Sequence, residues 1–198
     1  MIEALLLDLG NVVLEVDFRR TFRRWAASSG VDPAILHERW AEDQAYRAHE
    51  RGELSFEAYV DALGHRLGVA MSREDWQSGW NDVFVGPYPR VQERLADLAG
   101  RMPLYAFTNT NATHELAWRL RYGDALRHFR EIFVSSRLGV RKPDPAAFEQ
   151  VAAAMGVTPD AILFLDDNPH NVEGARQAGL ASLQVTSEDE VLAALEPY

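Results

Sequence analysis

The chain has no cysteine among its 198 residues, so disulfides, thiolate zinc sites and thiol nucleophiles are excluded. It also has no apolar run long enough to span a membrane. The first residues, Met1-Ile2-Glu3, lack the basic region that begins a secretory signal. From these absences we expect a soluble cytoplasmic protein with no membrane partner.

Basic residues are in the minority, with 20 Lys and Arg against 30 Asp and Glu, which gives a formal net charge of −10. A nucleic-acid partner needs a basic footprint, so the charge argues against one. A small phosphorylated molecule needs only a few local cations and remains compatible with this composition. The length and the 47% hydrophobic content suffice for a core with a small inserted domain. Nothing in the sequence indicates an oligomeric state.

Short apolar runs alternate with helical segments in two separate parts of the chain. The runs lie at residues 4–7, 104–107, 132–134, 162–165 and 180–185. This alternation predicts an α/β fold, a Rossmann-like parallel sheet with helices on both faces. Between Asp17 and Phe84 only helical patterns occur. We therefore expect a core of residues 1–15 and 86–198, interrupted by an all-helical insert of residues 16–85.

The finer pattern predicts three local features of the insert and its connections. Residues 12–16 form an extended flap, and residues 86–89 (Gly-Pro-Tyr-Pro) form a linker. A helix begins at Pro33 and runs through Trp40 toward His49. Four tryptophans at helical spacing are expected to pack inside the insert: Trp25, Trp40, Trp76 and Trp80.

Polar side chains follow four of the predicted strands. They are Asp8; Thr108 and Asn109; Ser135 and Ser136, with Lys142 beyond them; and Asp166 and Asp167. In an open parallel sheet, ligands bind outside the carboxyl ends of the strands, so these groups should converge. Three aspartates together repel one another unless a cation lies between them. With no His or Cys among them, they favour a hard cation such as Mg²⁺.

The remaining strand-end groups are hydrogen-bond donors, which suit an anion. Thr108, Asn109 and Lys142 are appropriate for binding a phosphate. A carboxylate, a divalent ion and a lysine around one phosphoryl group form a phosphoryl-transfer site. A receiver domain of a signalling relay also uses aspartates with Thr and Lys, but there the acid pair comes first and no helical insert is present.

These residues resemble the haloacid dehalogenase (HAD) superfamily of phosphohydrolases. Four motifs appear in order: Leu7-Asp8-Leu9-Gly10-Asn11-Val12, Phe107-Thr108-Asn109, Arg141-Lys142-Pro143-Asp144 and Leu165-Asp166-Asp167-Asn168. The resemblance implies a HAD fold whose helical cap is inserted after the first strand. Within the superfamily the chain resembles the bacterial α-D-glucose-1-phosphatase group. That likeness rests on residues 8–12, 49–53 and 109–111.

The resemblance implies a role for each residue at the metal and the nucleophile. Asp8 is the nucleophile and forms an aspartyl-phosphate. The carbonyl of Gly10 and the carboxylate of Asp167 join Asp8 around Mg²⁺, and Asp166 is a further or water-mediated ligand. The function so implied is that of a Mg²⁺-dependent phosphatase.

By the same resemblance, Thr108 and the backbone of Asn109 hold the phosphate oxygens of the substrate. Lys142 neutralises charge on the nucleophile and on the phosphate. The substrate is a small phosphorylated metabolite, with a sugar phosphate such as glucose 1-phosphate favoured.

One position departs from the family pattern. Most phosphatases of the family carry an acid two residues after the nucleophile, and this chain has Gly10 there. General acid–base assistance contributes about 10²–10⁴-fold, so its absence matters. The alternative function is therefore a HAD-fold binding or regulatory protein with weak or no turnover. For an active enzyme, Gly10 favours substrates whose leaving hydroxyl is acidic, such as a sugar phosphorylated at its anomeric carbon.

Several other residues have a structural interpretation beside a functional one. His49, Glu50 and Arg51 either face the site or form a solvated helix end, and we expect Glu50 to be solvated. His114 is expected to cap or pack. A solvated helix face is expected for four arginines: Arg19, Arg20, Arg23 and Arg24.

Overall fold

Strand β1 (Ala4–Leu7) lies at the centre of a five-stranded parallel sheet, and all four of its residues are fully buried. The computed structural model describes all 198 residues, and the order of the sheet is β5-β4-β1-β6-β7. The other strands are β4 (Leu104–Thr108), β5 (Glu131–Val134), β6 (Ile162–Asp166) and β7 (Ala181–Gln184). Every pairing in the sheet is parallel. The Rossmann-like sheet predicted from the sequence is confirmed.

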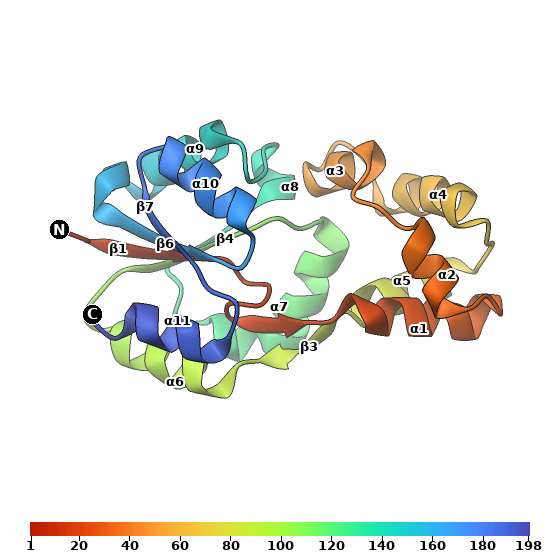
Figure 1. Cartoon of the computed structure of the whole chain (residues 1–198), viewed down its shortest axis with the longest axis horizontal. Coiled ribbons are helices and arrows are strands. Elements are labelled where there is room, and N and C mark those ends of the chain that lie inside the picture. The colour runs from red at the N-terminus through yellow and green to blue at the C-terminus, as the bar shows by residue number, and fades with distance from the viewer.

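Helices cover both faces of this sheet because successive β1 side chains point to opposite sides. Leu5 and Leu7 face a cluster with α6 (Pro89–Leu98), α7 (Ala112–Leu126) and α11 (Glu188–Leu195). Ala4 and Leu6 face a second cluster with α9 (Pro145–Met155) and α10 (Pro169–Gln177). Figure 1 shows α9 and α10 on one side of the sheet and α6 and α11 on the other. Two short elements complete the core: α8 (Ser135–Leu138) and the 3-10 helix η1 (Pro159–Ala161).

Five helices lie beyond one end of the sheet, and we call this group the cap (Figure 1). They are α1 (Phe18–Ser29), α2 (Pro33–Arg39), α3 (Gln44–Glu50), α4 (Phe56–Leu67) and α5 (Arg73–Asn81). The cap has its own aromatic cluster, in which Trp25 and Trp80 stack in parallel with ring centroids 5.9 Å apart. Trp76 is buried beside them and Trp40 packs against the cluster, as the spacing of the tryptophans predicts.

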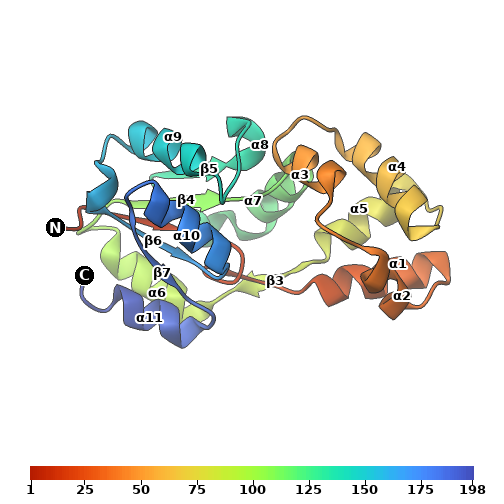
Figure 2. The ribbon, with the colours of Figure 1, turned by 45° about the horizontal axis from the view of Figure 1, so that its top comes forward.

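The two connections between cap and core form an antiparallel ribbon. Strand β2 (Leu14–Val16) pairs with β3 (Phe84–Pro87), and the Asp17 amide donates to the Val83 carbonyl at 2.8 Å. The linker predicted over residues 86–89 is therefore wrong in part, since its first half is strand. The reason is a contact between segments about seventy residues apart, whose backbone groups satisfy one another. Figure 2 shows this ribbon leading from the sheet to the cap.

The single helix predicted from Pro33 toward His49 is two helices. The backbone at Trp40 is extended (ψ 145°), and Asp43 caps α3 by accepting a bond from the Tyr46 amide at 2.9 Å. An Asp side chain that bonds to nearby amides favours a helix start over a helix interior. The break turns α3 toward the core, where it packs next to α8.

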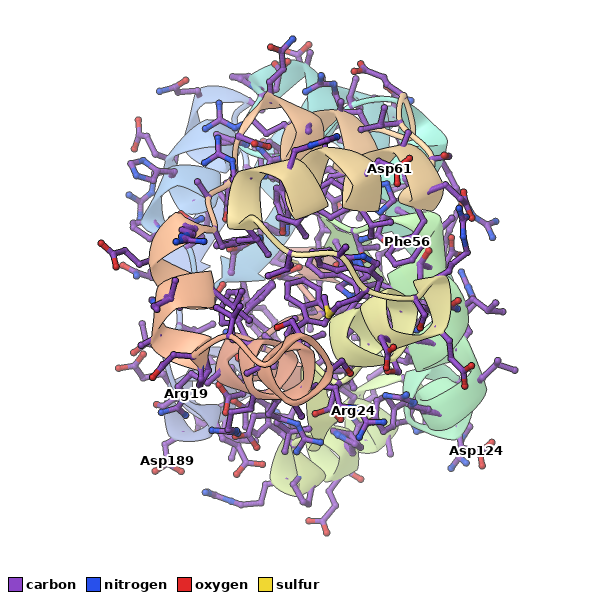
Figure 3. The ribbon with its side chains drawn as sticks, turned by 90° about the vertical axis from the view of Figure 1, so that its right-hand side faces the viewer. Arg19, Arg24, Phe56, Asp61, Asp124 and Asp189 are labelled. Carbon is purple, nitrogen blue, oxygen red and sulfur yellow. The ribbon has the colours of Figure 1, made fainter.

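The outer face of the cap is charged, as Figure 3 shows, with Arg19, Arg24 and Asp61 pointing outward. Arg19, Arg23 and Arg24 are exposed, which confirms the predicted helix face, whereas Arg20 is half-buried. The Arg20 Nε donates to the Asp82 carbonyl at 2.8 Å. None of the helices combines the length and the apolar character needed to cross a bilayer.

Candidate active site

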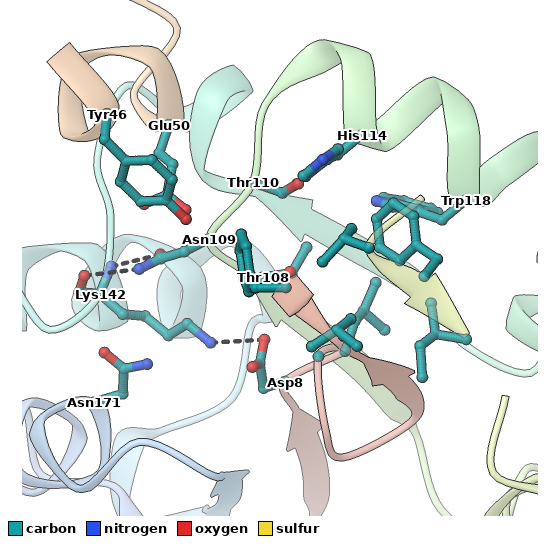
Figure 4. A pocket seen from close by; sticks show the side chains of 17 residues that line it. Asp8, Tyr46, Glu50, Thr108, Asn109, Thr110, His114, Trp118, Lys142 and Asn171 are labelled. Carbon is teal, nitrogen blue, oxygen red and sulfur yellow. Dashed lines mark hydrogen bonds and ion pairs between the residues drawn. The ribbon is translucent and has the colours of Figure 1, made fainter. Parts of the chain in front are cut away.

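A cavity of about 120 Å³ lies where the carboxyl ends of β1 and β4 meet the cap. Its polar side is lined by Asp8, Tyr46, Glu50, Thr108, Asn109, Thr110, His114, Lys142 and Asn171. Its other wall is formed by Leu9, Gly10, Leu14, Val16, Phe18, Val83, Phe84 and Trp118. Figure 4 shows Asp8 and Lys142 at the core side of this cavity, with Tyr46 and Glu50 at the cap side.

On the core side of the cavity, the ammonium group of Lys142 contacts three acceptors. Its Nζ donates to Asp8 Oδ1 at 2.9 Å, to Asp166 Oδ2 at 2.7 Å and to the Phe107 carbonyl at 2.8 Å. Burial by itself lowers the pKa of Lys142, but the charges of Asp166 and Asp8 more than offset this and raise it. Lys142 therefore stays cationic, although it is 1% exposed.

Asp8 ends β1 and is buried, with an exposed fraction of 9%. Burial raises the pKa of Asp8 to about 7, with Lys142 opposing the rise and Asp166 and Asp167 adding to it. Ligand oxygens of Asp8, Asp166 and Asp167 all lie within 4.8 Å of one another. Three carboxylates against one lysine leave an excess of negative charge, which a hard divalent cation would balance. The donor set therefore fits Mg²⁺.

The two aspartates after β6 have different surroundings. Asp166 is fully buried, and its oxygens accept bonds from Lys142 Nζ, the Asn168 amide and Asn171 Nδ2. Asp167 is only half-buried and accepts one side-chain bond, from Asn11 Nδ2 at 2.9 Å. Asp167 therefore has more freedom to bind a metal directly, whereas Asp166 is already held by protein donors.

The side chain of Asn109 links two loops of the site. Its Nδ2 donates to the Lys142 carbonyl at 2.8 Å, and its Oδ1 accepts from the Lys142 amide at 2.9 Å. This pair of bonds ties the end of β4 to the loop that carries Lys142 (Figure 4). With the Asn109 side chain so engaged, its backbone and the buried Thr108 are the groups that remain for a phosphate.

Of the residues predicted from strand ends, the cavity is lined by Asp8, Thr108, Asn109 and Lys142, and it is also lined by Gly10, which the family resemblance predicted. Asp166 and Asp167 stand beside it and complete the carboxylate cluster. Ser135 and Ser136 do not line it. The Ser135 hydroxyl donates to the Glu50 carbonyl at 2.7 Å and accepts from the Thr110 amide at 2.9 Å, so it joins core to cap.

Three cavity residues were missed or misjudged in the sequence. Asn171 holds both oxygens of Asp166, yet it sits in the first turn of α10 with no local signal of that role. The solvated position expected for Glu50 is wrong: its side chain is 5% exposed and lies against Arg141 at 2.8 Å. Tyr46 is buried one helical turn before it. Burial of Glu50 depends on the long-range contact with Arg141 and on a hydrogen bond with Tyr46, and sequence spacing does not reveal the first of these.

His114 packs between cap and core, as predicted. It is 7% exposed, and one ring nitrogen, Nε2, lies 2.9 Å from the Trp80 carbonyl. Burial lowers the pKa of His114 to about 3, so the ring is neutral near pH 7. A ring with that pKa does not supply the acid that is absent at Gly10.

We expect Gly174→Ala to destabilise the protein and disturb the site. Gly174 on α10 packs so closely on Pro143 that a Cβ would overlap the Pro143 carbonyl oxygen. Overpacking of this kind costs about 1–3 kcal/mol, and the strain falls on the loop of Lys142. Urea denaturation measures the loss in the free energy of unfolding.

Gly123→Ala is the control, since no atom of a neighbouring segment lies within 4 Å of its added Cβ. Because Gly123 follows a kink at Tyr122 in α7, this substitution should change the stability by less than about 1 kcal/mol. Equal midpoints for the two variants would contradict the prediction.

Comparison with known proteins agrees with the fold and the motifs. A family model described as haloacid dehalogenase-like hydrolase matches residues 2–179. The chain is 22% identical to D-ribitol-5-phosphate phosphatase of Bacteroides thetaiotaomicron, over 93% of this chain and 92% of that protein. It is 31% identical to an enolase-phosphatase of Aquifex aeolicus, over 95% of this chain and 92% of that protein.

Among solved structures, the chain is similar to a HAD family enzyme from Bacteroides thetaiotaomicron in complex with magnesium and inorganic phosphate. The TM-score is 0.80 at 22% identity, covering 93% of this chain and 94% of the other. At that identity the likeness concerns the fold. It extends over both the sheet and the helical cap.

Proposed function

Since the chain belongs to the haloacid dehalogenase-like hydrolase family, we propose that it is a Mg²⁺-dependent phosphatase of small phosphorylated metabolites, with sugar and polyol phosphates favoured. The observation that carries the proposal is the Asp8 carboxylate, which lies at a strand end, pairs with Lys142 and stands beside two further carboxylates. Two relatives that match nearly the whole chain are phosphatases by name, one of them for D-ribitol 5-phosphate. Glucose 1-phosphate and D-ribitol 5-phosphate are the first two substrates to test.

The metal in this proposal is held by Asp8, Asp167 and the Gly10 carbonyl. Asp166, whose oxygens already accept four contacts from protein donors, orients Lys142 and contributes as an outer ligand. When bound, Mg²⁺ neutralises the carboxylates and the phosphoryl oxygens so that two anions can approach each other.

In the proposed reaction, each core residue has a separate role. An oxygen of Asp8 attacks phosphorus, the bond to the leaving oxygen breaks, and that oxygen takes up a proton from water. The Thr108 hydroxyl and the backbone N–H of Asn109 donate to the phosphoryl oxygens, while Lys142 keeps Asp8 ionised and oriented. Water then attacks the aspartyl-phosphate, which releases inorganic phosphate and regenerates the Asp8 carboxylate.

A second candidate function follows from Gly10. No acid stands two residues after Asp8, and the neutral His114 does not replace it. A protein with this site and no turnover would bind phosphate esters, and phosphorylated ligands would then control its partners. Turnover separates the two candidates.

The test is phosphate release from ribitol 5-phosphate, glucose 1-phosphate and a chromogenic phosphate ester. Removing metal with EDTA should lower the rate at least about 100-fold, and Mg²⁺ should restore it. Ca²⁺ should restore little, because it is larger and takes more ligands. Asp167→Asn should raise the Mg²⁺ concentration for half-maximal rate about 10–100-fold. Full activity in EDTA would refute the metal assignment, and no release from any ester would favour the binding protein.

A further inference from the structure

Glu50 is a cap residue that the core holds in place. It ends α3, and its carbonyl accepts a bond from the Ser135 hydroxyl at 2.7 Å. Two residues later, Gly52 adopts a left-handed φ of 73° and packs on the Ser136 carbonyl, where a Cβ would not fit. Figures 1 and 2 both show α3 beside α8 at this point. These contacts with the core fix the position of the Glu50 backbone relative to the cavity.

The carboxylate of Glu50 is also held by the core, through Arg141. Arg141 contacts it through Nε and Nη2, both at 2.8 Å, and both contacts end on the same oxygen, Oε2. Oε1 is therefore not used by Arg141, and the Tyr46 hydroxyl is a second hydrogen-bond partner of the carboxylate. The Glu50 side chain lines the cavity, and Figure 4 shows it with Tyr46 on the side opposite Asp8.

This placement is unfavourable for an anionic ligand and needs a reason. On the core side, Asp8 lines the cavity and two further carboxylates stand beside it, and a phosphate adds more negative charge. Arg141 would be a natural anion ligand, but Glu50 occupies its guanidinium. A docking contact alone needs no carboxylate that lines the cavity. A carboxylate facing the non-phosphate end of a substrate accepts hydrogen bonds from hydroxyls and repels a second anion.

We propose that Glu50 is the specificity-determining residue of the site, selecting phosphate monoesters whose leaving group is neutral and carries several hydroxyls. Oε1 accepts from a substrate hydroxyl, and the negative charge disfavours leaving groups with a carboxylate or a second phosphate. Arg141 is a positioning residue that holds Glu50 and balances part of its charge. The inference rests on the proposed phosphatase function and deepens it.

The experiment compares kcat/KM for D-ribitol 5-phosphate, which is neutral apart from its phosphate, with that for 3-phosphoglycerate, which carries a carboxylate. The readout is the ratio of the two values, so a loss common to both substrates cancels. Glu50→Gln keeps the shape and removes the charge. It should lower the ratio about 10–100-fold, by weakening the hydroxyl contact and admitting the anion. Glu42→Gln is the control, because Glu42 is an exposed acid 3.7 Å from the same Arg141, and its ratio should not change.

A second variant should change the ratio in the same direction by another route. Arg141→Gln removes the cation that keeps the buried Glu50 ionised, so Glu50 takes up a proton and the ratio should fall, while both individual rates also fall. If the Glu50–Arg141 pair is only a latch between cap and core, both variants lower both substrates equally and the ratio stays constant. That result would overturn the inference, as would a wild-type preference for 3-phosphoglycerate. Wild-type protein that releases phosphate from neither substrate nor the chromogenic ester would refute the proposed function itself, and the inference with it.

Discussion

Asp8→Asn is expected to abolish phosphate release, by at least about 10⁴-fold for every ester, while the protein remains folded. An amide has nearly the shape of the carboxylate but does not attack phosphorus to form the acyl-phosphate. The variant also removes one of the three carboxylates that lie within 4.8 Å of one another. The measurement is phosphate release at saturating Mg²⁺, with the Tm recorded beside it.

Stability should not explain the loss. Asp8 is buried, and burial is the main cause that raises its pKa to about 7, so a neutral side chain is tolerated there. We expect the Tm of Asp8→Asn to equal or exceed that of the wild type in the absence of metal. Asp124→Asn on the exposed surface serves as the matched control and should keep full activity. A residual rate above about 1% would exclude Asp8 as the nucleophile.

The parts of the site that sequence reasoning found are those that parallel-sheet geometry brings together. Asp8, Thr108 and Asp166 each end or follow an apolar run, and runs of that kind become adjacent strands. Their side chains meet because the carboxyl ends of parallel strands lie at one edge. Lys142 is not at a strand end, and its place was indicated by the motif around it.

The parts that sequence reasoning missed depend on contacts between distant segments. Burial of Glu50 requires Arg141, which lies 91 residues away. The β2–β3 ribbon pairs Leu14 with Pro87, and neither strand has an alternating pattern long enough to be recognised alone. Local propensity is a weak signal where a tertiary contact satisfies the same polar groups. Such contacts decide how the cap sits on the core, and so what the cavity accepts.

Gly10→Asp should convert the site into one with general-acid assistance. A Cβ at Gly10 would lie 3.7 Å from Val16 Cγ2 and 3.9 Å from Asp8 Oδ2, which are ordinary contacts. The backbone there has no left-handed φ that would demand glycine. Neither the space around a Cβ nor the backbone conformation at this position therefore requires glycine. We expect kcat/KM for glucose 6-phosphate, an alkyl ester with a poor leaving group, to rise about 10²-fold.

The gain should depend on the leaving group. The anomeric hydroxyl released from glucose 1-phosphate is more acidic than a primary alcohol and needs less protonation, so its kcat/KM should rise by less than about 10-fold. Gly10→Asn is the matched control, since it adds similar volume with no proton to donate, and it should give no gain on either ester. If Asp and Asn at this position behave alike on glucose 6-phosphate, the wild-type site already obtains its proton elsewhere. Glycine at this position would then say nothing about which substrates the enzyme prefers.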